Sequence, residues 1–251
     1  MRIASGGGGD PMADAGPDSM TRQAGGAGAG PEGPYGGGPS AVVEVRLRIL
    51  ATTDIHANIL SYDYAANRPL FGQGLAQTAS LIAAARAEVP GALLFDNGDF
   101  LQGTALADLA ALQRRKRLHP VIAAFNTLGF DAATLGNHEF NFGLKVLETA
   151  LAGARFPIVS ANVLRLRGCT PLDDRTYLPP FAMLDRTLPD TTGQRQRLRV
   201  GVLGLTPPEI LRWDREHLAG RLDARPMIEA ARAWVPEMRR AGADIVVCLA
   251  H

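Results

Sequence analysis

The sequence has few of the features that mark disulfide-rich, membrane-spanning or strongly charged proteins. Only two cysteines, Cys169 and Cys248, occur among 251 residues, and they are far apart in the chain. Because Cys248 lies in an apolar segment, we expect it to be a buried small side chain rather than a bonded or reactive thiol. No apolar run is long enough to span a bilayer. The net charge of +1 gives no electrostatic reason to bind a nucleic acid polymer or a membrane surface.

Residues 1–40 differ in composition from the rest of the chain. They hold 13 Gly and 5 Pro and almost no aliphatic side chains. Such a segment cannot bury enough apolar surface to offset its loss of conformational entropy, so we predict a disordered tail. This start of the sequence also lacks the basic and apolar regions of a secretory signal. We interpret the remaining residues, 41–251, as one folded domain.

Strand-like and helix-like segments alternate through residues 41–251. The hydrophobic patterns predict strands at 43–52, 92–95, 131–135, 157–161, 198–205 and 244–250. Helical spacing predicts helices at 75–89, 104–112, 120–128, 144–151 and 227–240. The turn-forming residues from Asp190 to Gly193 predict a hairpin. This order is typical of an α/β domain with a largely parallel central sheet and an added antiparallel section.

Three polar clusters each follow a predicted strand. They are Asp54-Ile55-His56, Gly98-Asp99 and Gly136-Asn137-His138-Glu139. Ligands in α/β folds gather at the carboxyl ends of strands, so we expect these side chains, together with His251, at one end of one sheet. Carboxylate, imidazole and carboxamide groups suit Mg²⁺, Mn²⁺, Fe or Zn²⁺. Each cluster alone fits an ordinary turn, and the three in order predict a metal site.

This set of ligands predicts hydrolysis of a phosphoester by two divalent metals. Asp99 is the natural bridging ligand, because it lies in a tight turn between the other two clusters. Asp54 and His56 would bind the first metal, and Asn137 would bind the second. A water at this site would lose a proton near neutral pH and attack phosphorus in line. His138 would protonate the leaving oxygen or stabilise the transition state.

These motifs resemble the calcineurin-like metallophosphoesterase superfamily and, within it, the 5'-nucleotidase family. The resemblance covers about Leu47 to His251. The segments that carry it are Thr53-Asp54-Ile55-His56-Ala57-Asn58, Asn97-Gly98-Asp99, Leu135-Gly136-Asn137-His138-Glu139-Phe140 and Leu249-Ala250-His251. It implies a four-layer α/β/β/α sandwich with two mixed sheets, and a small nucleotide as substrate. It also implies His138 as the catalytic histidine and two divalent ions (Mn, Mg, Zn, Fe or Co) with the ligands Asp54, His56, Asp99, Asn137 and His251.

One departure from the family pattern helps to select a branch. Many 5'-nucleotidases have an aspartate two residues past the glutamate, where it pairs with the catalytic histidine, but this chain has Asn141. An asparagine can orient an imidazole but cannot stabilise its protonated form as a carboxylate would. The segments His138-Glu139-Phe140-Asn141-Phe142-Gly143 and Ser61-Tyr62-Asp63-Tyr64 resemble the bifunctional 2',3'-cyclic-nucleotide 2'-phosphodiesterase/3'-nucleotidases. Those enzymes open a cyclic phosphodiester on ribose to a 3'-phosphate and then remove the phosphate. This resemblance also implies a location in the periplasm or cell envelope.

The family pattern continues beyond the position of His251 with a Gly-His-x-His segment and a nucleobase-binding domain, which this sequence does not contain. We therefore expect a C-terminally incomplete domain, in which each metal lacks one ligand and hydrolysis is weak or absent. We also expect the last strand to present an exposed apolar edge. Two alternatives stay open: a 5'-nucleotidase or UDP-sugar hydrolase, and a non-catalytic metal- or nucleotide-binding remnant.

Other polar features receive no catalytic role. The basic run from Arg114 to Arg117 fits a solvated helix end or loop better than a phosphate-binding patch. His119 and His217 have no motif around them, so we interpret both as surface or loop residues.

Overall fold

The computed structural model describes residues 43–112 and 118–251, so the predicted disordered tail and the basic run from Arg114 to Arg117 lie outside the described residues. The strands are β1 (Ile49–Thr52), β2 (Tyr62–Asp63), β3 (Arg68–Pro69), β4 (Leu93–Asp96), β5 (Ala132–Thr134), β6 (Ile158–Val159), β7 (Val163–Leu166), β8 (Arg175–Thr176), β9 (Phe181–Pro189), β10 (Arg195–Leu205), β11 (Asp223–Ala224) and β12 (Ile245–Ala250). The helices are α1 (Leu75–Glu88), α2 (Ala105–Leu112), α3 (Pro120–Leu128), the 3₁₀ helix η1 (His138–Phe140), α4 (Leu144–Leu151), α5 (Ile210–Trp213), α6 (Arg215–Leu218) and α7 (Met227–Arg240).

Two sheets form the centre of the described structure. The first sheet has the order β1-β4-β5-β6, and each neighbouring pair is parallel. The second has the order β12-β10-β9, in which β12 is parallel and β9 antiparallel to β10. The predicted α/β class, with parallel and mixed sheets, is confirmed. The expectation that both sheets are mixed is wrong for the first, because its described strands are joined by crossovers that keep them parallel.

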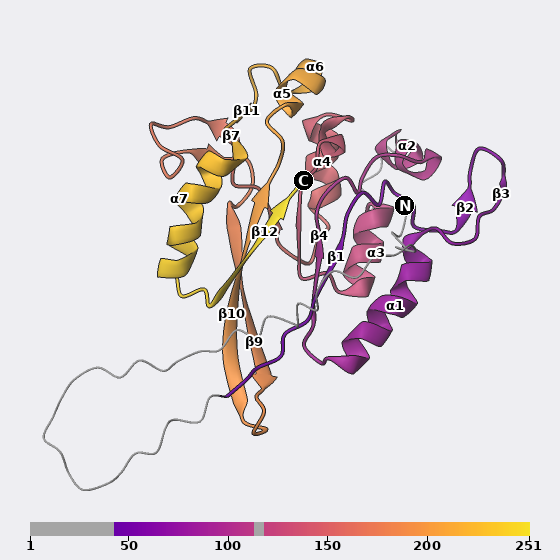
Figure 1. Ribbon diagram of the computed structural model, residues 1–251. Coiled ribbons are helices and arrows are strands. Elements are labelled where there is room, and N and C mark those ends of the chain that lie inside the picture. The colour runs from indigo at the N-terminus through magenta and orange to yellow at the C-terminus, as the bar shows by residue number, and fades with distance from the viewer. Residues whose placement is uncertain (1–42, 113–117) are drawn as a thin grey trace, which may run out of the picture.

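Alternation along the strands divides the core between the sheets and the helices. In β4, Leu94 packs with the helical cluster that includes α1 and α3, whereas Leu93 and Phe95 point the other way. Leu93 and Phe95 pack against Val200 and Val202 of β10, so the two sheets bury their facing sides against each other. A third apolar cluster joins β10 to α7, which covers the outer face of the second sheet. Figure 1 shows this succession of layers from α1 and α3 on one flank to α7 on the other.

Some predicted details differ in the structure. The alternating segment from Val43 becomes a strand only at Ile49, and Val45 forms one isolated bridge to Asp190. Cys248 is exposed rather than buried, because it lies on the side of β12 opposite to the buried Leu249. Within the described part of the chain β12 pairs with β10 alone. None of the helices in the described ranges has both the length and the hydropathy needed to cross a bilayer.

The carboxylate of Glu139 joins two loops at the carboxyl end of the first sheet. Its Oε1 accepts hydrogen bonds from the backbone N–H groups of Phe100 (2.7 Å) and Leu101 (3.0 Å). Its Oε2 accepts from the N–H groups of Asp99 (2.8 Å) and Gly136 (2.6 Å). Burial raises the pKa of Glu139, repulsion from Asp99 adds to this, and the backbone donors act in the opposite direction. The loop after β4 and the loop after β5 are therefore joined through one buried side chain.

His119 lies in the connection directly before α3, as a loop residue would, but it is buried, so its interpretation as a surface residue is wrong. It is the N-cap of the helix, and its Nδ1 accepts a hydrogen bond from the backbone N–H of Val121 at 3.3 Å. An accepting Nδ1 requires the neutral ring. Burial lowers the pKa of His119 to about 4, which keeps the ring neutral through the physiological range.

Replacing the buried carboxylate tests its role in joining the loops. In Glu139→Gln one oxygen becomes an NH₂ group, which cannot accept a hydrogen bond and would face backbone donors. Because buried N–H groups then lose their partner, we expect the free energy of unfolding to fall by about 2–5 kcal/mol. Urea denaturation measures this, with Glu148→Gln on the exposed face of α4 as the matched control. Equal, small effects of the two substitutions would show that Glu139 does not join the loops.

The stability of the protein should depend on pH through His119. The folded pKa of about 4 lies below the ordinary value of 6.5, so the contribution is complete above about pH 6.5 and is lost as the pH falls through 4. At about pH 5 this linkage amounts to roughly 2 kcal/mol. His119→Asn keeps an N-cap without a titrating ring, and should lose that much less stability than the unaltered protein on acidification from neutral pH. Denaturant unfolding at the two pH values measures this.

His217→Asn, at a half-buried ring, is the control for this comparison. It should follow the unaltered protein. If His119→Asn also follows the unaltered protein, the buried cap has no part in the acid sensitivity of the fold.

Candidate metal centre

The three predicted clusters meet at the carboxyl end of the first sheet. They follow β1, β4 and β5, and His251 follows β12 of the second sheet. The first loop is bonded to the second through its backbone: the N–H of Asp54 donates to the carbonyl of Gly98 at 3.0 Å, and the N–H of His56 donates to that of Asp99 at 2.9 Å. The backbone therefore sets the relative position of side chains that are about 45 residues apart in the sequence, as expected for strands joined by a helix.

Four of the five predicted ligands lie together. Asp54, Asp99 and His251 each offer one ligand atom, and these atoms all lie within 4.8 Å of one another. His56 adjoins them, with its Nε2 3.7 Å from Oδ1 of Asp54. Asn137 directly precedes η1, and among the described residues its side chain makes no capping bond to that helix. Its amide is therefore not used to cap the helix.

The two histidines among the candidate ligands share one arrangement of their rings. Nδ1 of His56 lies 2.9 Å from the carbonyl oxygen of Gln102, and Nδ1 of His251 lies 2.8 Å from that of Asn97. A carbonyl oxygen only accepts, so each Nδ1 carries a proton and each Nε2 faces the other groups of the centre. Metal-binding histidines are commonly fixed in this way by the nitrogen that does not bind the metal. The donor set therefore fits divalent metal ions.

Asp99 is almost fully buried, at 2 % exposure, and both of its oxygens have partners. Oδ1 accepts from the backbone N–H of His138 at 2.8 Å, and Oδ2 lies 3.1 Å from Nε2 of His251. Burial acts to raise the pKa of Asp99, but the hydrogen bond from His251 and that from the backbone of His138 outweigh it, so the pKa lies below its ordinary value. Asp99 is thus held as a carboxylate.

The sequence analysis did not single out Asp96, which supports the same loop. Asp96 is fully buried at the end of β4, where its oxygens accept from the hydroxyl of Thr52 (2.6 Å) and from the N–H of Gly98 (2.9 Å). Burial raises its pKa well above the ordinary value, and repulsion from Glu139 and Asp54 adds to the shift. Asp96 therefore supports the loop that carries Asp99.

The backbone of the centre is left-handed at several residues that are not glycine. Among the described residues, the non-glycine positions with positive φ are Asp54 (51°), His56 (48°), Ala57 (54°), Asp99 (58°) and Asn67 (49°). All but Asn67 belong to the loops of the metal centre. Such conformations are uncommon outside glycine and persist where surrounding contacts enforce them, often at functional sites.

Two glycines allow the second and third loops to approach closely. A Cβ on Gly98 would lie 2.4 Å from the backbone nitrogen of Gly136, and one on Gly136 would lie 2.2 Å from Oδ1 of Asp99. Any larger side chain at either position would therefore push the loops apart or displace Asp99. The glycines of these two motifs are required by this backbone contact.

The predicted catalytic pair lies beside the ligands. The ring of His138 meets that of His56 edge to face, with centroids 5.2 Å apart. Nδ1 of His138 lies 2.6 Å from Oδ1 of Asn141, as expected for an asparagine that orients the imidazole. The amide nitrogen of Asn141 in turn donates to Oδ1 of Asp214 at 2.8 Å. No motif in the sequence marks Asp214, which lies far along the chain.

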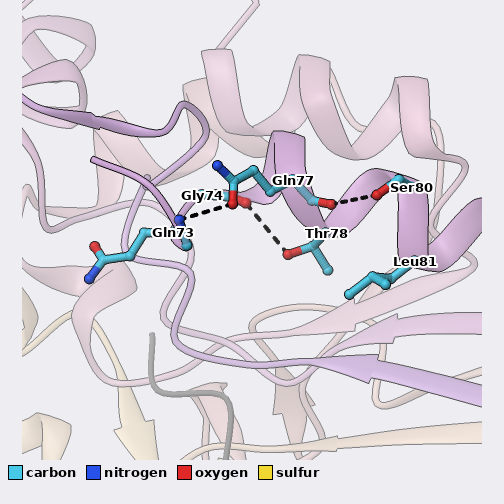
Figure 2. A pocket seen from close by; sticks show the side chains of 7 residues that line it. Gln73, Gly74, Gln77, Thr78, Ser80 and Leu81 are labelled. Carbon is cyan, nitrogen blue, oxygen red and sulfur yellow. Dashed lines mark hydrogen bonds between the residues drawn. The ribbon is translucent and has the colours of Figure 1, made fainter. Parts of the chain in front are cut away.

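Two surface hollows lie in the described part of the chain outside this centre. One of about 420 Å³ lies at the start of α1, where the polar groups of Gln77, Thr78 and Ser80 bond within the segment (Figure 2). No histidine, cysteine or carboxylate occurs among the described residues that line it. Another, of about 330 Å³, is lined in part by Gly103, which packs against His56. Only this second hollow adjoins the candidate site.

Comparison with known proteins agrees with this geometry. The family model described as "Calcineurin-like phosphoesterase" matches residues 47–251. The 2',3'-cyclic-nucleotide 2'-phosphodiesterase/3'-nucleotidase of Salmonella typhimurium is 44% identical over 209 residues, which cover 82% of this chain and 32% of that protein. The trifunctional nucleotide phosphoesterase protein YfkN of Bacillus subtilis is 42% identical over 218 residues, which cover 84% of this chain and 14% of that protein. The chain thus spans about a third or less of the length of these two relatives.

Solved structures show the same relationship. The crystal structure of YfkN from Bacillus subtilis matches with a TM-score of 0.78 and 41% identity, covering 82% of this chain and 62% of that one. A putative 5'-nucleotidase from Staphylococcus aureus matches with a TM-score of 0.68 and 28% identity, covering 82% and 37%. From its motifs, its fold and the match over residues 47–251, the chain belongs to the calcineurin-like phosphoesterase family.

Proposed function

We propose that the protein takes part in metal-dependent hydrolysis of nucleotide phosphoesters, converting 2',3'-cyclic nucleotides to 3'-nucleotides and then to nucleosides. The observation that carries this proposal is the convergence of Asp54, Asp99 and His251 beside the imidazole of His138. The pairing of His138 with Asn141 supports the cyclic-nucleotide branch, to which the relative from Salmonella typhimurium belongs by name.

We assign two divalent ions to the centre. Asp54 and His56 would bind one ion, Asn137 and His251 the other, and Asp99 both. The mixture of carboxylate, imidazole and carboxamide donors suits Mn, Mg, Zn, Fe or Co. Bound there, the ions would supply an activated water and neutralise charge on the phosphoryl oxygens. The fixed rings of the two histidines and the buried carboxylate of Asp99 support this assignment, because they present ligand atoms without rearrangement.

His138 is assigned the transfer of a proton to the leaving ribose oxygen. Opening the cyclic ester breaks the bond between phosphorus and the 2' oxygen, and removing the remaining phosphate breaks the bond to the 3' oxygen. Both oxygens leave more readily when they are protonated. Since Nδ1 of His138 donates to Asn141, Nε2 is the nitrogen left for this transfer, and it has a proton to donate when the ring is in its doubly protonated form.

A second candidate activity acts on a different phosphate position. The 5'-nucleotidase and UDP-sugar hydrolase reading is supported by the structural match to the putative 5'-nucleotidase from Staphylococcus aureus. A non-catalytic, metal-binding role is the third candidate. Asn141 lacks the charge of the aspartate that many 5'-nucleotidases have at this position. We further propose that the layers form the four-layer α/β/β/α sandwich of the family, and that the protein acts in the periplasm or cell envelope.

Loss of the bridging carboxylate should weaken metal binding. Asp99→Asn keeps the size of the side chain but removes its charge, so we expect the affinity for Mn²⁺ to fall at least tenfold to about a hundredfold. Isothermal titration calorimetry of the metal-free protein measures this. Asp108→Asn, at an exposed carboxylate on α2, is the control and should bind Mn²⁺ as the unaltered protein does. Equal affinities for all three proteins would contradict the assignment of the centre.

Product analysis tests the proposed reaction. With Mn²⁺ and 2',3'-cyclic AMP we expect 3'-AMP to form first and adenosine afterwards, as followed by chromatography. His138→Gln should keep its affinity for Mn²⁺ and lose turnover by a factor of about 10²–10⁴, the usual contribution of a general acid. His217→Gln is the control and should remain active.

The same assay separates the alternatives. Hydrolysis of 5'-AMP or a UDP-sugar, without hydrolysis of 2',3'-cyclic AMP, would favour the second activity. Normal binding of Mn²⁺ with no hydrolysis of any of these substrates would favour the non-catalytic role.

A further inference from the structure

Asn141 lies between an imidazole and a carboxylate that come from distant parts of the chain. Its Oδ1 is 2.6 Å from Nδ1 of His138, and its Nδ2 donates to Oδ1 of Asp214 at 2.8 Å. Asp214 lies between α5 and α6, which are at the upper end of the molecule in Figure 1, the end toward which β12 runs. The three side chains form one series of hydrogen bonds that ends at a buried carboxylate.

We propose that Asp214 is a positioning residue for His138, which acts by fixing the orientation of the Asn141 amide. The role in catalysis rests on the proposed function, whereas the positioning itself does not require turnover. A carboxylate can only accept hydrogen bonds, so the amide must turn its NH₂ group to Asp214. The carbonyl of the amide then faces His138, and Nδ1 of the imidazole must carry the proton.

Asparagine alone would leave the imidazole without this direction. An amide can present either its oxygen or its nitrogen, and the two ends have nearly the same shape. With the nitrogen toward His138, the ring would have to accept at Nδ1 and carry its proton on Nε2. Asp214 excludes that arrangement because it has no hydrogen to give. The carboxylate thus selects the tautomer of a ring that it does not touch.

The simpler roles for Asp214 do not account for its side chain. It occupies the N-cap position of α6, yet its side chain makes no capping bond within the described structure. It is only 6 % exposed, and its Oδ2 has no hydrogen-bond partner among the described residues. A buried carboxylate oxygen without a partner costs stability. The hydrogen bond described for this side chain is the one that it accepts from Asn141, which in turn contacts His138.

The series makes a specific prediction for exchanged residues. Asn141→Asp alone would place two carboxylates in contact in a buried site, where they repel each other. Asp214→Asn alone would let both amides turn, because each could then donate or accept. The double substitution Asn141→Asp with Asp214→Asn restores one direction, since the new carboxylate can only accept, from His138 on one side and from the new amide on the other. The pair should therefore be strongly coupled.

The first test measures the tautomer of His138 by NMR. In protein with ¹⁵N-labelled histidine, at a pH where the ring is neutral, we expect the proton on Nδ1. The signals are assigned by comparison with His138→Gln. Asp214→Asn, which keeps the shape of the side chain, should give a mixture of tautomers, and the exchanged double variant should return to Nδ1–H. Asp223→Asn, at a carboxylate paired with Arg167 on the surface, is the matched control and should change nothing.

An unchanged tautomer in folded Asp214→Asn would overturn the proposal. Backbone amide spectra show whether each variant is folded. If the double variant does not fold, the tautomer of His138 in Asp214→Asn alone decides whether Asp214 positions the ring. This measurement does not depend on hydrolysis, so it separates failure of the positioning role from failure of the proposed function.

The second test uses turnover of 2',3'-cyclic AMP with Mn²⁺. We expect each single substitution to lower kcat by about tenfold to a hundredfold with little change in KM, since a misplaced general acid loses part of its contribution. The double variant should recover to within a few-fold of the unaltered protein. Additive losses in the double variant would contradict the coupling, whereas absence of hydrolysis by the unaltered protein, with the tautomer as expected, would overturn only the proposed function.

Discussion

The four hydrogen bonds to the carboxylate of Glu139 are the interaction on which the arrangement of the metal centre depends. Their donors are backbone N–H groups of the loops after β4 and β5, and the whole assembly is out of water. These donors have no strand partner where the chain turns, and burial without a partner would be costly. Because Glu139 binds them all, the ligand Asp99 and the neighbouring His138 keep a fixed separation. Its own oxygens are fully used and are not offered to a metal.

The first loop is attached to this unit mainly through its backbone, and Nδ1 of His56 adds a contact to the carbonyl of Gln102. The N–H groups of Asp54 and His56 donate to carbonyls of the second loop, which requires the left-handed conformation seen at both residues. Strain of this kind is stable only where other contacts enforce it, and here the close contact of Gly98 with Gly136 and the hydrogen bonds of Glu139 do so. The candidate ligand side chains add to these contacts, since Oδ1 of Asp99 accepts from the N–H of His138 in the third loop. Oδ2 of Asp99 and Nε2 of His56 are left to face the other groups of the candidate centre.

The sequence predicted the elements and the grouping of the candidate ligands better than the residues that support them. Strand ends can be found from hydrophobic patterns, so the positions of Asp54, Asp99 and His251 at one end of the sheets followed from the sequence. Hydrogen-bond partners could not be found in this way. Asp96 and Glu139 carry carboxylates, which suit a metal ion, but nothing in the motifs shows that their oxygens already accept hydrogen bonds. Asp214 reaches Asn141 across 73 residues, and only the folded chain brings them together. The buried cap at His119 was missed for the same reason, since burial depends on packing between elements.

Residues of one type have opposite roles in this centre, and their hydrogen-bond partners distinguish them. Asp96 and Asp99 lie in one turn, yet the oxygens of Asp96 bond to the hydroxyl of Thr52 and a backbone N–H, whereas Asp99 directs an oxygen at His251. Among the histidines, the cap His119 accepts at Nδ1, while His251 donates from Nδ1 to a carbonyl and leaves Nε2 for the centre. The direction of the hydrogen bond at the far nitrogen or oxygen decides whether a side chain supports the loop or offers an atom to a cation. The same rule applies to His138, where an amide held in one direction determines which nitrogen faces the substrate side.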